Sequence, residues 1–233
     1  MRSPRNNREY IVVSVGGSLI VPDGIDVAFL KNFRDLVLQK TRTGSNFFII
    51  AGGGRPAREY QDAARLVRGD LDREDLDWLG IHATRMNGHL LRTLFKEEAH
   101  HKFIKNPNFT RTPKDPVVIG AGWRPGNSSD YCAVLAAKSL GAKKLVNLSN
   151  IDYVYTADPR TNPDATKIES IGWEAFRKLI PEEWDPGLSS PFDPVAAREA
   201  EALGLEVAVI NGMNLEAFGN YIDGKPFVGT VIS

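Results

Sequence analysis

Cysteine is almost absent from the chain, because Cys132 is the only one among 233 residues. A lone cysteine excludes an internal disulfide framework and fits a reducing compartment. No uncharged apolar run approaches the roughly 18 residues that a membrane-spanning helix needs. Neither sign of charge is in excess, since 29 Lys and Arg residues balance 29 Asp and Glu residues, which argues against a nucleic-acid or membrane surface. We therefore expect a cytoplasmic protein with no nucleic-acid or membrane partner.

Several familiar site patterns are also missing. The chain has only 4 histidines and no set of cysteines beside them, so we expect no transition-metal site. The pattern G-x-x-x-x-G-K-[ST] does not occur, which excludes a P-loop nucleotide-binding protein. Gly120, Gly122 and Gly126 resemble a dinucleotide fingerprint, but one residue too many precedes the third glycine. A Rossmann dehydrogenase is therefore a poor fit.

What the chain does have is an alternation of short β-branched runs with helical periods. Hydrophobic residues make up 42% of the composition, enough for a sizeable core. The pattern predicts strands at residues 10–15, 46–51, 116–121, 144–149, 206–210 and 227–232. It predicts helices at residues 27–40, 56–67, 72–95, 128–140 and 193–203. This order predicts an α/β fold, namely a three-layer α/β/α arrangement with a central, mostly parallel sheet in a single domain over residues 1–233.

Residues 96–114 interrupt the pattern, because the segment is polar, contains two prolines and has no clear period. We predict a mobile or partner-facing excursion there. A short strand is expected within it at residues 102–104.

Four loops of unusual composition follow predicted strands, at residues 16–18, 52–55, 120–130 and 149–158. In a parallel sheet such loops share the carboxyl edge, where ligands bind. Glycines let backbone N–H groups approach a phosphate, and the following helix adds a favourable dipole. One glycine-rich loop alone is as well explained by a tight strand-to-helix turn. Three in sequence, each directly after a buried strand, favour an anion site.

Motifs in and between these loops carry a family resemblance. They are Val-Gly-Gly-Ser-Leu at 15–19, Ala-Gly-Gly-Gly-Arg-Pro-Ala-Arg at 51–58, Asp-Trp-Leu-Gly-Ile-His-Ala-Thr-Arg-Met-Asn at 77–87, Asn-Ile-Asp-Tyr-Val-Tyr-Thr-Ala-Asp-Pro at 150–159 and Asp-Pro-Val-Ala-Ala at 193–197. Together they resemble the amino acid kinase superfamily, and within it the uridylate (UMP) kinases of the archaeal type. The resemblance extends over residues 10–232, nearly the whole chain.

The resemblance implies ATP-dependent phosphoryl transfer to UMP, giving UDP in pyrimidine nucleotide synthesis, with Mg²⁺ accompanying ATP. Residues 10–130 would form the acceptor-binding part and residues 140–233 the ATP-binding part. It also implies a homo-oligomer, with a hexamer expected, that packs through the helix at residues 72–95. No residue of the chain is assigned as a metal ligand.

The resemblance also assigns site residues. Arg58, Gly17 and Ser18 would form the catalytic group, and the carboxylate of Asp77 would accept hydrogen bonds from the ribose hydroxyls of UMP. The ATP-binding set is Gly17, Ser18, Gly54, Arg58, Ser149, Asn150, Tyr155 and Asp158. The UMP-binding set is Gly53, Asp77, Trp123, Arg124, Pro125, Gly126, Asn127, Ser128 and Ser129.

Alternatives remain open at several of these positions. Asp77 is either the ribose ligand or a solvated charge in the first turn of its helix, and Trp123 either stacks on a base or packs within its loop. Ser14 stands where many superfamily members have a lysine, although archaeal uridylate kinases also lack that lysine. The rival functions are a kinase of another small acid or phosphate, and a non-catalytic nucleotide-binding protein that stores molybdenum or tungsten oxometalate.

Overall fold

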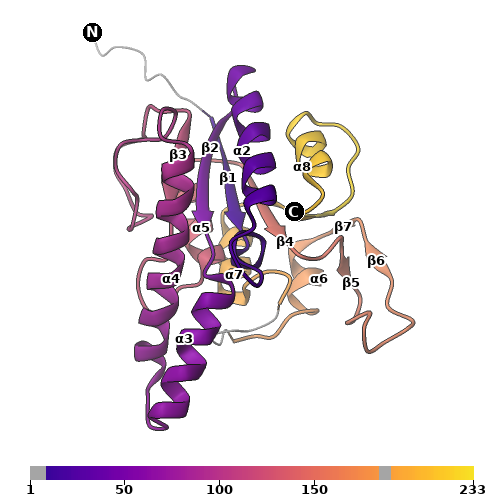
Figure 1. Cartoon of the computed structure of the whole chain (residues 1–233). Coiled ribbons are helices and arrows are strands. Elements are labelled where there is room, and N and C mark those ends of the chain that lie inside the picture. The colour runs from indigo at the N-terminus through magenta and orange to yellow at the C-terminus, as the bar shows by residue number, and fades with distance from the viewer. Residues whose placement is uncertain (1–8, 184–189) are drawn as a thin grey trace.

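The computed structural model describes residues 9–183 and 190–233 and is built around a seven-stranded sheet (Figure 1). The strands lie in the order β3-β2-β1-β4-β8-β9-β7, and each pair is parallel except β8 with β9. Their bounds are β1 Tyr10–Val15, β2 Asn46–Ala51, β3 Val117–Gly120, β4 Lys144–Ser149, β7 Ser170–Ile171, β8 Glu206–Asn211 and β9 Thr230–Ile232. A separate antiparallel ladder joins β5 Val154–Tyr155 to β6 Lys167–Ile168. The predicted mostly parallel central sheet is confirmed.

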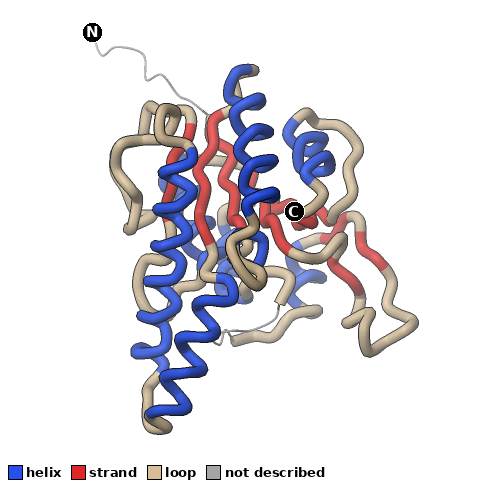
Figure 2. Tube along the Cα trace, viewed as in Figure 1, coloured by secondary structure: helices blue, strands red, loops and turns tan. Residues whose placement is uncertain are grey.

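Helices cover both faces of this sheet (Figure 2). They are α1 Gly17–Ile20, α2 Val27–Arg42, α3 Gly54–Val67, α4 Arg73–Leu94, α5 Ser129–Leu140, α6 Trp173–Arg177, α7 Pro194–Ala202 and α8 Leu215–Ile222. The side chains of β1 alternate between two cores: Val13 and Val15 pack with α2, α4 and α8, whereas Tyr10 and Val12 pack with α5, α6 and α7. Both faces of the strand are buried, which is why its sequence is apolar apart from Ser14. The predicted three-layer α/β/α arrangement is confirmed.

Four of the five predicted helix starts coincide with side-chain caps, whereas α3 begins at Gly54 without one. Asp26 accepts a hydrogen bond from the backbone N–H of Phe29 at 2.8 Å, and Ser128 accepts one from Tyr131 at 3.0 Å. Asp72 and Asp193 cap α4 and α7 in the same way. These caps satisfy N–H groups that lack an intrahelical partner, so the short polar residues before each apolar period determine where the helices begin.

Residues 96–115 lie along the β3 edge of the sheet. Ala99 and Ile104 form isolated bridges to β3, so the strand expected at residues 102–104 is reduced to single bridging residues. The hydroxyl of Tyr10 donates to the carbonyl of Asp115 at 2.7 Å, and Phe109 stacks on Phe48 with ring centroids 5.5 Å apart. The segment therefore packs against the sheet through aromatic and backbone contacts that its irregular sequence did not reveal.

The C-terminal region differs from the sequence expectation in two details. Helix α8 was not expected, and β9 begins at Thr230 instead of residue 227. The hydroxyl of Thr230 is buried and accepts a hydrogen bond from the backbone N–H of Val154 at 2.8 Å, which links β9 to the β5–β6 ladder. Within residues 9–183 and 190–233, no helix combines the length and the apolar character needed to cross a membrane.

Candidate active site

The loops after β1 and β2 touch each other directly at the carboxyl edge of the sheet. A Cβ atom on Gly17 would overlap the backbone of Gly53 and Gly54, and Gly54 itself has a φ of +68°, where glycine is favoured. The N–H of Gly52 donates to the carbonyl of Val15 at 2.9 Å, which extends the strand pairing into the loops. Only glycine permits this approach, so the two predicted anion-binding loops form one continuous backbone surface.

The loop after β4 joins the same surface. The N–H of Gly16 donates to the carbonyl of Leu148 at 2.8 Å, and the carbonyl of Ser149 accepts from Gly212 at 2.8 Å. The carboxyl ends of β1, β2, β4 and β8 are therefore held together by backbone hydrogen bonds. The structure brings together Gly17, Gly53, Gly54 and Ser149 from the two halves of the chain.

The buried side-chain amide of Asn87 binds the glycine loop that follows β2. It lies on α4 with only 5% of its surface exposed, and its Nδ2 atom donates to the carbonyls of Gly52 at 2.8 Å and Gly53 at 3.1 Å. Satisfying two buried carbonyls holds the loop in one conformation. The sequence analysis missed this residue, although a polar side chain on the apolar face of the predicted helix at 72–95 was a signal for it.

A cavity of about 250 Å³ opens beside this loop, between α3, α4 and the β3–α5 loop. Seven residues of the predicted site line it: Gly53, Gly54, Arg58, Asp77, Asn127, Ser128 and Ser129. Gln61, Thr84 and Gly122 also line it and were not in the predicted set. The cavity combines a cation, a carboxylate, hydroxyls and the N-terminal end of α3, which is suited to a polar, anionic ligand.

Asp77 faces this cavity and is not a solvated charge. Its side chain is buried, and Oδ2 accepts a hydrogen bond from the N–H of Gly126 at 2.7 Å. Burial raises the pKa of the Asp77 carboxyl, while the hydrogen bond from Gly126 and the charge of Arg73 lower it. One oxygen of the Asp77 carboxylate thus already holds the β3–α5 loop through its hydrogen bond with Gly126.

Comparison with known proteins gives the family. The sequence pattern described as the amino acid kinase family matches residues 9–211. This chain belongs to the amino acid kinase family. It is 33% identical to uridylate kinase of Pyrococcus abyssi over 218 residues, which covers 92% of this chain and 96% of that protein. It is 31% identical to uridylate kinase of Methanocorpusculum labreanum, with 95% and 94% of the two chains covered.

Solved structures agree with this membership in the amino acid kinase family. The crystal structure of uridylate kinase from Archaeoglobus fulgidus superimposes on this chain with a TM-score of 0.79 at 28% sequence identity. The superposition covers 96% of this chain and 100% of the Archaeoglobus chain. UMP kinase from Bacillus anthracis superimposes with a TM-score of 0.76 at 18% identity, which speaks for the fold alone. The resemblance that the motifs indicated is therefore confirmed at the level of the family.

The arginines of α3 in this family member differ in their surroundings. Arg55 forms ion pairs with Asp23 and Glu59, so its charge is compensated within the protein. Arg58, one turn further, lines the cavity instead. The structure thus places Arg58, and not Arg55, in the lining of the cavity.

Two carboxyl groups form a second polar cluster beneath the loops. The hydroxyl of Ser14 donates to Asp130 Oδ1 at 2.9 Å, and the N–H of Asp193 donates to Asp130 Oδ2 at 3.3 Å. Part of the Asp130 surface remains accessible, yet the dense protein around it, together with the negative charge of Asp193, raises its pKa to about 6. Ser14 is thus hydrogen-bonded to a carboxyl group near the carboxyl end of β1. Neither carboxyl was in the predicted site.

Several other predicted residues lie outside the lining of this cavity. Trp123 is half-buried against the core of α5 to α7, with the guanidinium carbon of Arg124 4.1 Å from its ring centroid. Tyr155 is in β5, and Asn150 is exposed just after β4. The structure brings neither Trp123 nor Arg124 into the lining of the acceptor-side cavity described above.

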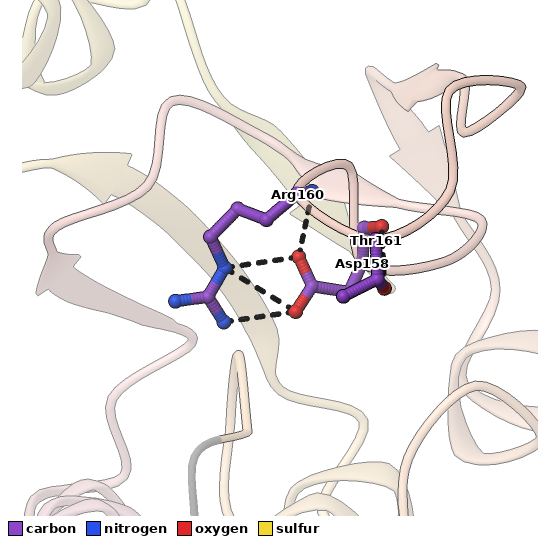
Figure 3. A network of polar contacts seen from close by, with 3 residues as sticks. All are labelled: Asp158, Arg160 and Thr161. Atoms are coloured by element: carbon purple, nitrogen blue, oxygen red, sulfur yellow. Dashed lines mark hydrogen bonds and ion pairs between the residues drawn. The ribbon is translucent and has the colours of Figure 1, made fainter.

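Asp158 caps a turn in the loop between β5 and β6 (Figure 3). Its carboxylate accepts from Arg160 Nη2 at 2.8 Å and from the backbone N–H of Arg160 at 2.9 Å, and its carbonyl accepts from Thr161. The pairing with Arg160 lowers the pKa of Asp158. A donor nucleotide bound here would meet a carboxylate that is already paired.

Proposed function

We propose that the protein transfers the terminal phosphoryl group of ATP to UMP, giving UDP. The observation that carries the proposal is the buried carboxylate of Asp77 in a cavity that also holds Arg58 and the N-terminus of α3. A carboxylate accepts from two adjacent hydroxyls, whereas an arginine and a helix N-terminus bind a phosphate. A nucleoside monophosphate presents both groups. The relatives named uridylate kinase, 31% and 33% identical over more than nine-tenths of the chain, support uridine as the nucleoside.

In this proposal residues 10–130 bind the acceptor and residues 140–233 bind ATP, within a single domain. Gly53 holds the phosphate of UMP, Gly17 and Ser18 hold the phosphates of ATP, and Gly54 and Arg58 hold the transferring group between them. Because Gly17 and Gly54 are in backbone contact, the two nucleotides would meet phosphate to phosphate across one continuous surface. Transfer is direct, without a phosphorylated protein, since positioning and charge neutralisation supply most of the catalysis in such reactions.

Mg²⁺ enters as part of the ATP substrate. It prefers oxygen ligands and is usually held by substrate phosphates together with one or two carboxylates. The carboxyls beside the loops, Asp130 and Asp193, already accept hydrogen bonds from Ser14 and from Ala196. This donor set fits a metal ion that the phosphates mainly ligate. When bound, the ion would neutralise part of the phosphate charge.

The rival functions are less well supported. If the acceptor were a small carboxylic acid, its carboxylate would lie in the same cavity as the buried carboxylate of Asp77, and the two negative charges would repel each other. Storage of oxometalate is not suggested by relatives that are named uridylate kinases. Asp77 therefore separates the proposed function from the small-acid alternative.

The test is a substrate panel applied to matched variants. We expect turnover of UMP with MgATP, and weaker or no turnover of CMP, AMP, GMP and small carboxylic acids. Asp77→Asn should raise the KM for UMP by roughly tenfold or more, because a charged acceptor of hydroxyl hydrogen bonds is lost. Asp75→Asn, an exposed carboxylate on the same helix, is the control and should leave the KM unchanged. No turnover of any nucleotide by the unaltered protein would refute the proposal.

We also propose that the protein is a cytoplasmic homo-oligomer, with a hexamer expected. Large apolar side chains are exposed on α3 and α4: Tyr60, Leu66, Val67 and Met86 are 66%, 87%, 89% and 73% exposed. These two helices extend beyond the sheet as an antiparallel pair (Figure 1). Exposed apolar groups gathered on one pair of helices are typical of a surface that another subunit covers.

A further inference from the structure

The β3–α5 loop, residues 121–128, forms one wall of the acceptor cavity and is fastened to α4 by three side chains. The hydroxyl of Thr84 accepts from the N–H of Gly122 at 2.9 Å, and Asp77 accepts from Gly126 at 2.7 Å. The third is Arg85, the only one that carries a positive charge. The fastening is close, because a Cβ on Gly122 would meet the Thr84 hydroxyl at 2.7 Å.

Arg85 grips two successive carbonyls of this loop. Its Nη2 atom donates to the carbonyl of Trp123 at 2.8 Å, and its Nε atom donates to the carbonyl of Gly122 at 3.3 Å. The guanidinium carbon lies 5.8 Å from the ring centroid of Trp78, which is about two helical turns earlier on the same face of α4. The planar guanidinium group of arginine has N–H donors in fixed directions and can bind two neighbouring carbonyls at once. The ammonium group of lysine is a compact charge that does not match this geometry.

The peptide between Gly122 and Trp123 is held from its other side as well. In a trans peptide the C=O and N–H groups point in opposite directions. The carbonyl of Gly122 faces Arg85, and the N–H of Trp123 faces the buried thiol of Cys132 on α5. The first half of the loop is thus fixed between α4 and α5. Its position determines where the second half, Gly126 to Ser129, lies in the wall of the cavity.

We propose that Arg85 is a positioning residue for the acceptor nucleotide: by holding the Gly122 and Trp123 carbonyls it sets the β3–α5 loop in the conformation that binds UMP. This proposal rests on the proposed function. Without Arg85, only Thr84 and Asp77 hold the loop to α4, and Asp77 must also meet the ribose. The loss therefore falls on acceptor binding, while the ATP side and the transfer step keep their geometry.

Three variants test this role. Arg85→Met keeps the length and apolar stem but removes the donors, and Arg85→Lys keeps the charge but loses the fork. The matched control is Arg92→Met, because Arg92 lies two turns further along the same face of α4 and donates to the carbonyl of His101 at 2.6 Å. It performs the same kind of fastening on the segment at 96–115, away from the cavity.

Steady-state kinetics and hydrogen exchange are the two readouts. Arg85→Met should raise the KM for UMP by roughly tenfold, with the KM for ATP and kcat changed by less than about threefold. Arg85→Lys should recover only part of the loss. Amide exchange in residues 121–128 should become faster in Arg85→Met and stay unchanged in Arg92→Met, which should instead affect residues 96–104.

An unchanged KM for UMP in Arg85→Met, an equal rise in the KM values for UMP and ATP, or full rescue by lysine would overturn the proposal. A lowered kcat with an unchanged KM would also overturn it. The exchange experiment needs no turnover. If the unaltered protein did not phosphorylate UMP, the proposed function would fall, whereas exchange in residues 121–128 would still decide whether Arg85 fixes the loop.

Discussion

Replacing Asn87 with alanine is expected to loosen the glycine loop after β2 and to slow phosphoryl transfer. The substitution removes two hydrogen bonds, one to the buried carbonyl of Gly52 and one to the partly buried carbonyl of Gly53, and leaves both carbonyls without that donor. At roughly 1–2 kcal/mol for each lost bond and uncompensated carbonyl, the free energy of unfolding should fall by about 2–4 kcal/mol. For a chain of this size that corresponds to a decrease in Tm of roughly 5–15 °C.

The functional effect should exceed the effect of instability. Gly53 and Gly54 contact Gly17, so a displaced loop misplaces both anion-binding surfaces, and a shift of about 1 Å lowers kcat by up to roughly a hundredfold. Asn46→Ala is the control, because Asn46 stands at the opposite end of β2 and its Nδ2 atom donates to the carbonyl of Glu9 at 3.2 Å. It should lower the Tm while leaving kcat within about twofold at a temperature where both variants are folded. The reasoning is refuted if Asn87→Ala and Asn46→Ala show the same decrease in Tm and both retain the kcat of the unaltered protein.

Two further predictions concern the same edge of the sheet. Gly17→Ala should destabilise the protein by at least about 2 kcal/mol, because the added methyl would overlap the backbone of Gly54, whereas Gly69→Ala, in open space, should be neutral within about 0.5 kcal/mol; chemical denaturation measures both. The pKa of Asp130, raised to about 6, means that its charged form is disfavoured in the folded state, a cost that is absent near pH 4 and complete above about pH 6. We therefore expect the free energy of unfolding of Asp130→Asn, relative to that of the unaltered protein, to increase by about 2 kcal/mol between pH 4 and pH 7. A difference that does not change with pH would show that the pKa of Asp130 is not raised.

Local patterns predicted most of the fold. The buried apolar strands and the short polar caps Asp26, Asp72, Ser128 and Asp193 are patterns of contiguous residues, so the main strands, the long helices and their layering followed from the sequence, whereas short elements such as α8 did not. The packing of residues 96–115 did not follow, because it depends on partners far along the chain, such as the hydroxyl of Tyr10, which reaches the carbonyl of Asp115.

The candidate site divides in the same way. The glycine loops could be predicted because each follows a strand directly, and Arg58 was assigned through the motif at residues 51–58 that resembles the family. Asn87, Arg85 and Asp130 could not, because each acts on a backbone or side-chain group that only the folded chain brings near. Both Arg85 and Asn87 lie in the motif at residues 77–87, but the motif alone does not show which backbone carbonyls they bind.

The central claim is that the acceptor lies between α3, α4 and the β3–α5 loop with its phosphate toward the glycine loops. A crystal structure of the protein with UMP bound tests it most directly. The account predicts the phosphate beside Arg58 and Gly53, and the ribose hydroxyls within hydrogen-bond distance of Asp77. UMP bound at the β4 and β8 side of the edge, or with its ribose turned away from Asp77, would contradict it.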